Sequence, residues 1–167
     1  HHTHTHTITP SHSSFQSPPP NFPYSFSAPL GTFSMYRQEG VACPDWAASA
    51  APLCAIRFDH ETRIEDFDGA IGHADFANRR LGGGALTGGT VQEEILFALK
   101  PECYTAMACC GVMELNEAIV LAGAERWSTY DGYGRSWRCA GPHKDGTARA
   151  EGLHPRRELL CYDAIVA

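Results

Sequence analysis

The residues best suited to chemistry lie in a glycine-rich loop and in the acidic segment that follows it. Five glycines fall within residues 82–89, and Gln92-Glu93-Glu94 follows after two further residues. Glycine lets the backbone approach a ligand closely and turn successive N–H groups toward one anion. Because the loop runs into a predicted helix, whose N-terminal amides also favour negative charge, a diphosphate is the natural ligand. The alternative is a glycine-rich surface turn, since the loop lacks the Gly-Lys-Ser/Thr ending of a P-loop and its GxGxxG spacing is imperfect.

The two glutamates at the start of this helix have a structural and a chemical interpretation. Thr90-x-x-Glu93 has the spacing of a capping box, in which the glutamate at the third helical position accepts the amide of the N-cap residue. That role accounts for Glu93 but not for Glu94, which we expect on the first turn beside the glycines. A carboxyl group kept protonated there could act as the general acid that breaks a glycosidic bond. The alternative is that both glutamates belong to a solvated helix face.

Short apolar runs separated by turn residues predict the elements that position this loop. We expect a helix over residues 91–99, ended by Pro101. We expect strands over residues 53–58, 70–76, 117–122, 133–139 and 159–166. Strands that are apolar on both faces, mixed with helices, indicate an α/β layered fold.

The first 40 residues have a different composition from the rest. Residues 1–36 contain no Asp, Glu, Lys or Arg and are rich in His, Thr, Ser and Pro. We therefore expect residues 1–40 to be a disordered, low-complexity tail or linker, and residues 41–167 to be the folded domain. The alternating histidines could chelate a metal, but low complexity alone accounts for them. Six Phe and Tyr residues are many for a solvated tail, which suggests that part of it docks against sequence that is missing here.

Composition excludes several classes of protein. The 167 residues carry 13 Lys and Arg against 19 Asp and Glu, a net charge of −6, which argues against a general nucleic-acid binder. No run approaches the ~18 apolar residues of a membrane-spanning helix. Seven cysteines without a CxxC pair fit neither a disulfide framework nor a structural zinc site. We expect a reduced, intracellular protein without a metal centre.

A glycine triplet, a short spacer and Gln-Glu-Glu together resemble the catalytic signature of the poly(ADP-ribose) glycohydrolases. Here the triplet is Gly82-Gly83-Gly84, and seven residues separate it from Gln92-Glu93-Glu94. Further segments recur in the same order and at similar spacing: Ile64-Glu65-Asp66, Asp75-Phe76-Ala77-Asn78, Lys100-Pro101-Glu102, Tyr130-Asp131-Gly132-Tyr133, and Arg156-Arg157 with Tyr162-Asp163-Ala164. The resemblance covers residues 56–167, about two-thirds of the chain.

The resemblance implies a macrodomain, a three-layer α/β/α fold with a mixed sheet and a ligand cleft beyond the strand ends. It implies an enzyme that hydrolyses the ribose–ribose O-glycosidic bonds of poly(ADP-ribose), with the free polymer or ADP-ribosylated proteins as substrate, and releases ADP-ribose. No metal and no cofactor are implied. Neither direct nucleic-acid binding nor membrane association is expected. A monomer of the nucleus or cytoplasm, linked to the DNA damage response, is expected by the same resemblance.

Carried onto this sequence, the resemblance assigns catalysis to two glutamates and an asparagine. Glu94 would be the general acid and base, giving a proton to the departing ribose hydroxyl as positive charge develops on the sugar. Glu93 would hold ribose hydroxyls, which competes with its capping role, and Asn78 would position the scissile ribose. Backbone amides of the loop and its continuation would cradle the diphosphate, beginning with Gly82, Gly83 and Gly84.

The resemblance also implies an adenosine subsite built from separate segments. Ile64, Glu65 and Gln92 would recognise the adenine. Tyr133 would pack against the adenosine end or a phosphate. Phe76 would line the cleft, although a buried strand position suits it equally.

Members of this family continue past the point where this sequence stops, into a second glycine-rich loop and further strands and helices. We therefore expect a C-terminally truncated fragment of the catalytic macrodomain, whose incomplete sheet exposes apolar surface. This departure leaves a second hypothesis open, namely a non-catalytic ADP-ribose-binding macrodomain or a truncated pseudoenzyme. A Rossmann-like dinucleotide-binding domain is a third, which the glycine spacing disfavours.

Overall fold

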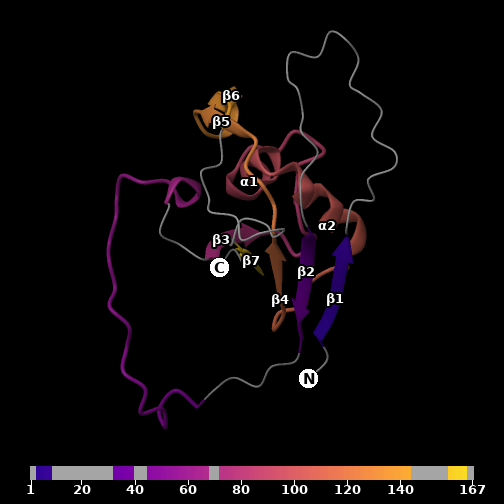
Figure 1. Ribbon diagram of the computed structural model, residues 1–167. Coiled ribbons are helices and arrows are strands. Elements are labelled where there is room, and N and C mark those ends of the chain that lie inside the picture. Colours follow the sequence, from indigo (N-terminus) through magenta and orange to yellow (C-terminus); the bar gives the residue numbers. More distant parts are fainter. Residues whose placement is uncertain (1–2, 9–31, 40–44, 68–71, 144–157, 165–167) are drawn as a thin grey trace.

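A computed structural model describes residues 3–8, 32–39, 45–67, 72–143 and 158–164 (Figure 1). The largest element of this part is a five-stranded sheet with the strand order β1-β2-β4-β7-β3. β3 runs parallel to β7, and the other neighbouring strands are antiparallel, so the sheet is mixed. The strands are β1 (Thr3–Ile8), β2 (Phe33–Gln38), β3 (Gly72–Ala77), β4 (Ala118–Ala122) and β7 (Glu158–Asp163).

Short helices and a hairpin complete the described structure. The helices are η1 (Ile64–Asp66), α1 (Gln92–Leu99), η2 (Pro101–Cys103), α2 (Tyr104–Cys109) and η3 (Gly134–Ser136). β5 (Ser128–Asp131) pairs with β6 (Arg138–Pro142) in a separate two-stranded ribbon. A mixed sheet with helices confirms the predicted α/β class. Among the described residues, every helix is too short or too polar to cross a membrane.

The hydrophobic core lies between the sheet and the two α-helices. Burial alternates along the central strands, as expected where only one face of a sheet is covered. The inward residues of β4 and β7 are all fully buried: Ile119, Leu121, Leu159 and Cys161. From the helical side, Phe97 of α1 is fully buried and makes an edge-on ring contact with Tyr104 of α2. The core therefore fixes α1, the helix that carries the glutamate pair, against the sheet.

α1 ends where its sequence cannot continue a helix. Lys100 precedes Pro101 and has left helical geometry, with φ −126° and ψ 77°. The proline ring disfavours helical geometry in the residue before it. Ile95, Leu96 and Leu99 are buried, so apolar side chains hold the second half of the helix in place.

Four of the predicted elements are confirmed with small shifts at their ends. The strands expected at residues 70–76, 117–122 and 159–166 correspond to β3, β4 and β7, and the helix expected at residues 91–99 corresponds to α1. Each of these segments contains several apolar residues, and Pro101 and Gly123 mark the ends of two of them.

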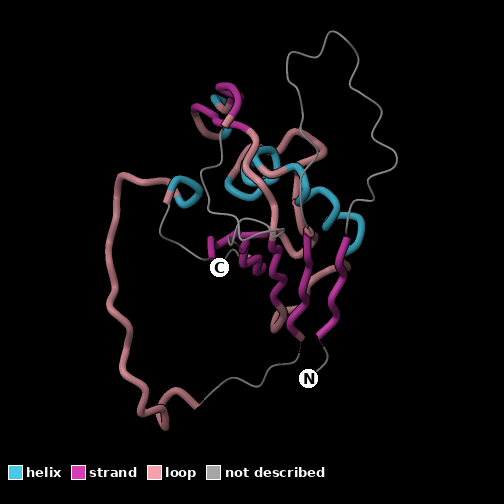
Figure 2. Tube along the Cα trace, viewed as in Figure 1, coloured by secondary structure: helices cyan, strands magenta, loops and turns pink. Residues whose placement is uncertain are grey.

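Two predicted strands are wrong in whole or in part. Residues 53–58 form no strand and run as an extended loop outside the sheet (Figure 2), and Leu53 is 94% exposed. A short apolar run becomes a strand only when a partner strand lies beside it, and periodicity does not reveal partners. In the segment 133–139, a turn of 3-10 helix precedes β6, which begins only at Arg138.

Strand β2 lies in the stretch where we expected a disordered tail. It pairs with β4 from Ser34 opposite Ala122 to Gln38 opposite Ala118, and β1 pairs with β2 on its other side. Phe33 and Met35 of β2 are buried in the core. The aromatic content of this stretch suggested docking against missing sequence, whereas β2 pairs with a strand of this chain. Residues 1–2, 9–31 and 40 of the expected tail lie outside the described residues.

Replacing the most enclosed aromatic residue of the core tests this packing. Phe97→Ala should lower the free energy of unfolding by about 3–5 kcal/mol, because it removes a large side chain and leaves a cavity. Leu86, 73% exposed in the glycine loop, supplies the control, and Leu86→Ala should change stability by less than about 0.5 kcal/mol. Denaturant unfolding of both variants measures the difference; equal effects would contradict the described core.

Candidate active site

The glycine loop joins the end of β3 to the start of α1 and folds as consecutive tight turns. Gly83 N donates to the Arg80 carbonyl at 3.0 Å, and Ala85 N donates to the Gly82 carbonyl at 2.8 Å. Gly82 and Gly83 have φ values of 88° and 46°, in the left-handed region that favours glycine. The turns themselves therefore require glycine at these two positions.

The carboxylate of Glu93 is buried against this loop. Its side chain is 3% exposed. It accepts hydrogen bonds from the backbone N–H of Gly82 at 2.5 Å and from that of Asn78 at 2.9 Å. Glu93 thereby ties both the start of the loop and the end of β3 to the first turn of α1, and it does not lie on a solvated helix face.

Glu94 makes equivalent contacts further along the loop. Its Oε1 accepts the N–H of Gly84 at 2.9 Å, and its Oε2 accepts the N–H of Val91 at 2.9 Å. Val91 is the N-cap of α1, so Glu94 occupies the third helical position. The predicted capping box of Thr90 and Glu93 is therefore wrong by one residue, because the helix begins at Gln92. The expected position of Glu94, on the first turn beside the glycines, is confirmed.

The two carboxylates converge on Gly83. A Cβ built on Gly83 would lie 2.8 Å from a carboxylate oxygen of Glu93 and 2.8 Å from one of Glu94. A Cβ on Gly89 would lie 2.7 Å from the carboxyl carbon of Glu94. These separations are too short for real contacts, so the missing side chains of the loop make the space in which both acids sit.

Burial raises the pKa of Glu93 to about 7, and the nearby carboxylates of Asp75 and Glu94 act in the same direction. Asp75 is fully buried on β3, and burial raises its pKa to about 6. Burial thus favours the neutral form of both Asp75 and Glu93. Sequence reasoning misses Asp75, although it opens the block that ends at Asn78.

Asn78 and Phe76 lie at the exposed end of β3. The Oδ1 of Asn78 accepts the N–H of Arg80 at 2.9 Å. Phe76 is 48% exposed and makes an edge-on ring contact with Tyr162 of β7. The buried strand position weighed for Phe76 is therefore wrong, and its ring remains available at the surface.

The carboxamide of Gln92 is bonded to the edge of β3. Its Nε2 donates to the Ala74 carbonyl at 2.8 Å, and its Oε1 accepts the N–H of Phe76 at 2.9 Å. Among the described strands β3 is at the edge of the sheet, so this side chain satisfies backbone groups that face away from β7. One N–H and one lone pair of the carboxamide are left for a ligand, and the adenine role of Gln92 stays a prediction.

The remaining residues of the expected adenosine subsite come from two other segments. Glu65 is buried in η1, 7% exposed, and η1 lies against β3. Tyr133 is 57% exposed. The residue after it, Gly134, donates its N–H to the Thr90 carbonyl at 2.9 Å, which places Tyr133 next to the end of the glycine loop. Ile64, beside Glu65 in η1, is partly buried.

The backbone amides expected to cradle a diphosphate are already bonded within the protein. Gly82 and Gly84 donate to Glu93 and Glu94, and Gly83 donates to Arg80. The expectation that these three amides are open to an anion is therefore not met in this structure. The physical reason is that the glutamate carboxylates take the amides of Gly82 and Gly84, while the amide of Gly83 closes a turn.

The family of the chain is decided by its similarity to known proteins. Residues 43–167 match the family described as Poly (ADP-ribose) glycohydrolase (PARG), Macro domain fold. The chain belongs to this family. The glycine triplet, both glutamates and all the expected subsite residues lie within the matched part.

Curated relatives carry the same family name. The chain is 40% identical over 140 residues to Poly(ADP-ribose) glycohydrolase 1 of Arabidopsis thaliana, a match that covers 82% of this chain and 25% of the relative. It is 42% identical over 120 residues to Probable poly(ADP-ribose) glycohydrolase 2 of the same plant, covering 72% and 23%. It is 44% identical over 88 residues to Poly(ADP-ribose) glycohydrolase 1 of Caenorhabditis elegans, covering 53% and 11%. The chain spans a quarter or less of the length of these relatives.

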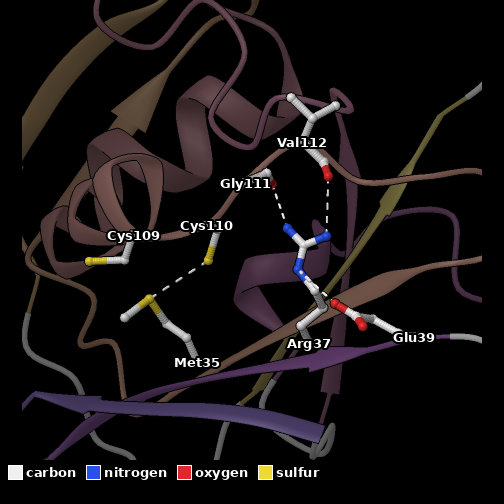
Figure 3. A pocket seen from close by; sticks show the side chains of 7 residues that line it. All are labelled: Met35, Arg37, Glu39, Cys109, Cys110, Gly111 and Val112. Atoms are coloured by element: carbon white, nitrogen blue, oxygen red, sulfur yellow. Dashed lines mark hydrogen bonds and ion pairs between the residues drawn. The ribbon is translucent and has the colours of Figure 1, made fainter. Parts of the chain in front are cut away.

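A cavity of about 280 Å³ lies elsewhere in this PARG-family chain, between β2 and the segment after α2 (Figure 3). The guanidinium of Arg37 reaches across it and donates to the carbonyls of Gly111 at 2.5 Å and Val112 at 3.1 Å. Cys110 Sγ lies 3.9 Å from Met35 Sδ. None of the residues expected in the active site lines this cavity. In the described part of the chain, no three His, Cys, Asp or Glu side chains form a group that could hold a metal ion.

Adding one methyl group at Gly89 tests how Glu94 is held. Gly89→Ala should push the Glu94 carboxylate off the amides of Gly84 and Val91, because the new Cβ would overlap the carboxyl group. The amide hydrogens of Gly84 and Val91 should then exchange at least tenfold faster with solvent. Gly88→Ala is the matched control, since a Cβ there meets no atom within 4 Å, although its φ of 88° costs about 1–2 kcal/mol of stability. Unchanged exchange in Gly89→Ala would contradict the packing.

The raised pKa of Glu93 predicts a pH-dependent stability. Because its carboxyl titrates at about 7 when folded, against an ordinary value of 4.5, the folded state binds more protons between these values. The contribution is fully present below about pH 4.5 and is lost as pH rises through 7. Glu93→Gln removes it. The stability of the wild type relative to this variant should fall by roughly 2–3 kcal/mol from pH 5 to pH 8, as denaturant unfolding at several pH values would measure. A pH-independent difference would show that Glu93 titrates normally.

Proposed function

We propose that this chain carries the catalytic centre of a hydrolase that cleaves the ribose–ribose O-glycosidic bonds of poly(ADP-ribose) and releases ADP-ribose. The observation that carries the proposal is the pair of buried glutamates, each bonded to backbone amides of the glycine loop and both converging on Gly83. Membership of a family whose relatives are named poly(ADP-ribose) glycohydrolases supports it.

In this mechanism, the acid acts at the oxygen of the bond that breaks. Glu94 gives a proton to the departing ribose oxygen while positive charge develops on the other sugar. Its carboxylate then accepts a proton from the water that attacks that sugar. The bonds from the amides of Gly84 and Val91 fix the position of the carboxylate, so little reorganisation is needed as charge changes.

Glu93 and Asn78 bind the sugar in this proposal. The carboxyl of Glu93, which titrates near neutral pH, holds ribose hydroxyls as donor or acceptor according to its charge. The amide nitrogen of Asn78 donates to the scissile ribose, since its oxygen is used by Arg80. The diphosphate is bound by amides in the continuation of the loop, beyond those engaged by the glutamates. Ile64, Glu65, Gln92 and Tyr133 form the adenosine end.

A second candidate function is a module that binds ADP-ribose without cleaving it. The observation that favours it is the capping role of Glu94, whose two oxygens both accept backbone amides. That role explains Glu94 without catalysis. The raised pKa of Glu93 also gives a reason to test Glu93 as the acid within the first function.

The exposed face of the sheet supports a further part of the proposal, the third layer of the macrodomain. Tyr36, Leu160 and Tyr162 are exposed on β2 and β7, opposite the face that packs against α1 and α2. We propose that a second helical layer covers them, that residues 41–167 are part of the catalytic macrodomain, and that β1 and β2 extend its sheet. A monomer of the nucleus or cytoplasm that binds no nucleic acid directly, and a role in the DNA damage response, remain predictions.

Isosteric replacement of each glutamate in the full-length protein tests the mechanism. Glu94→Gln should lower turnover of poly(ADP-ribose) by a factor of about 10² or more, the usual scale for a lost general acid, while ADP-ribose still binds. Glu114→Gln, at an exposed position outside the set of expected site residues, should leave turnover unchanged. Release of ADP-ribose and calorimetric binding are the two measurements.

The wild type, Glu94→Gln and Glu93→Gln together distinguish the alternatives. Wild-type protein that binds ADP-ribose but releases none from the polymer would favour the binding module. Full turnover in Glu94→Gln, with turnover lost in Glu93→Gln, would transfer the acid role to Glu93.

A further inference from the structure

The carboxylate of Glu65 is held by a residue from a distant part of the chain. The hydroxyl of Tyr130, on β5, donates to Glu65 Oε1 at 2.5 Å. Burial and the neighbouring carboxylate raise the pKa of Tyr130 to about 12, so its hydroxyl is a donor throughout the physiological range. No hydrogen bond to the second oxygen of Glu65 occurs among the described residues, and that oxygen is not enclosed. One half of the carboxylate is thus fixed and the other half is left for a partner.

Two arginines hold both ends of this contact. The buried guanidinium of Arg126 donates to the Glu65 carbonyl at 3.3 Å and pairs with Asp66, while its Nε donates to the Ser128 carbonyl at 3.1 Å. Arg126 therefore joins η1 to the start of β5. Arg63 lies 4.4 Å from the centre of the Tyr130 ring and donates to the Tyr130 carbonyl at 3.1 Å. Two contacts therefore fix the Tyr130 hydroxyl relative to Glu65. Arg126 bonds the backbone of η1 and of β5, and the guanidinium of Arg63 stacks on the Tyr130 ring.

We infer that Tyr130 is a positioning residue that sets base specificity, by orienting Glu65 so that its open oxygen accepts a hydrogen bond from the exocyclic amine of an adenine. This inference rests on the proposed function, since it needs an adenine at Glu65. Tyr130 does not touch the ligand; it acts through Glu65.

The chemistry of the base explains why orientation matters. Adenine presents an amino donor where hypoxanthine presents a carbonyl acceptor. A carboxylate oxygen faces the first favourably and repels the second, and discrimination of this kind is strong when the protein group is buried and fixed. Without the Tyr130 hydroxyl, the carboxylate is free to rotate, and rotation weakens the preference.

Tyr130→Phe in the full-length protein tests the inference. The change removes one oxygen and keeps the ring under Arg63. Affinity for ADP-ribose should fall about tenfold, the preference for ADP-ribose over its hypoxanthine analogue should fall by a similar factor, and KM for poly(ADP-ribose) should rise with kcat within twofold. Tyr104→Phe, in which the ring packs on Phe97 away from η1, is the matched control and should change none of these values.

A double-mutant cycle shows whether Tyr130 acts through Glu65. Glu65→Gln alone should weaken the preference for adenine, and adding Tyr130→Phe to it should have less than a twofold further effect, because the two changes disrupt one interaction. Independent effects that multiply would overturn the inference, as would an unchanged base preference in Tyr130→Phe. If the wild type binds neither nucleotide, the proposed function fails together with this inference. If it binds ADP-ribose and Tyr130→Phe is indistinguishable from it, the inference alone fails.

Discussion

The interaction on which the site depends is the bonding of two carboxylates to the backbone of a glycine loop. Glu93 accepts the amides of Asn78 and Gly82, and Glu94 accepts those of Gly84 and Val91. A buried carboxylate without partners is too costly to keep, whereas two accepted N–H groups offset part of the cost of burying it. The amides have to come close to do this, and side chains on the loop would prevent it. Acids and glycines therefore form one structural unit.

This arrangement changes what the loop can do for a ligand. An amide that donates to Glu93 or Glu94 is not free to donate to a phosphate, and two carboxylates nearby would repel a diphosphate if both were ionised. The pKa of Glu93, raised to about 7, reduces that repulsion because the site carries less than its full negative charge near neutral pH. The loop thus acts first to position the acids, and anion binding is left to its outer part.

Local pattern predicted the parts of the structure that depend on nearby residues. The helix at 91–99 and the strands β3, β4 and β7 each contain several apolar residues, and all four were found. The predicted start of the helix is wrong by one residue, because Thr90 is a better N-cap by type than Val91. The hydrogen bonds that Glu94 accepts from Gly84 and Val91 decide between the two. The pairing of β2 with β4, and the solvent exposure of residues 53–58, depend on which segments meet in space. The bonds from Gln92 to β3 and from Tyr130 to Glu65 span 16 or more residues, and spacing along the chain carries no signal for them.

The hydrogen bonds of Gln92 join the edge of the sheet to the helix that carries the two glutamates. An edge strand presents unpaired N–H and C=O groups, and here the carboxamide closes one such pair on β3. The next residues of the same helix, Glu93 and Glu94, bond the loop that follows β3. Three consecutive side chains thus fix a strand end, a loop start and a loop end relative to one helix. A shift of that helix would move all three together. The positions of Asp75 in β3 and of Asn78 just after it are therefore set by the same helix that carries the glutamate pair.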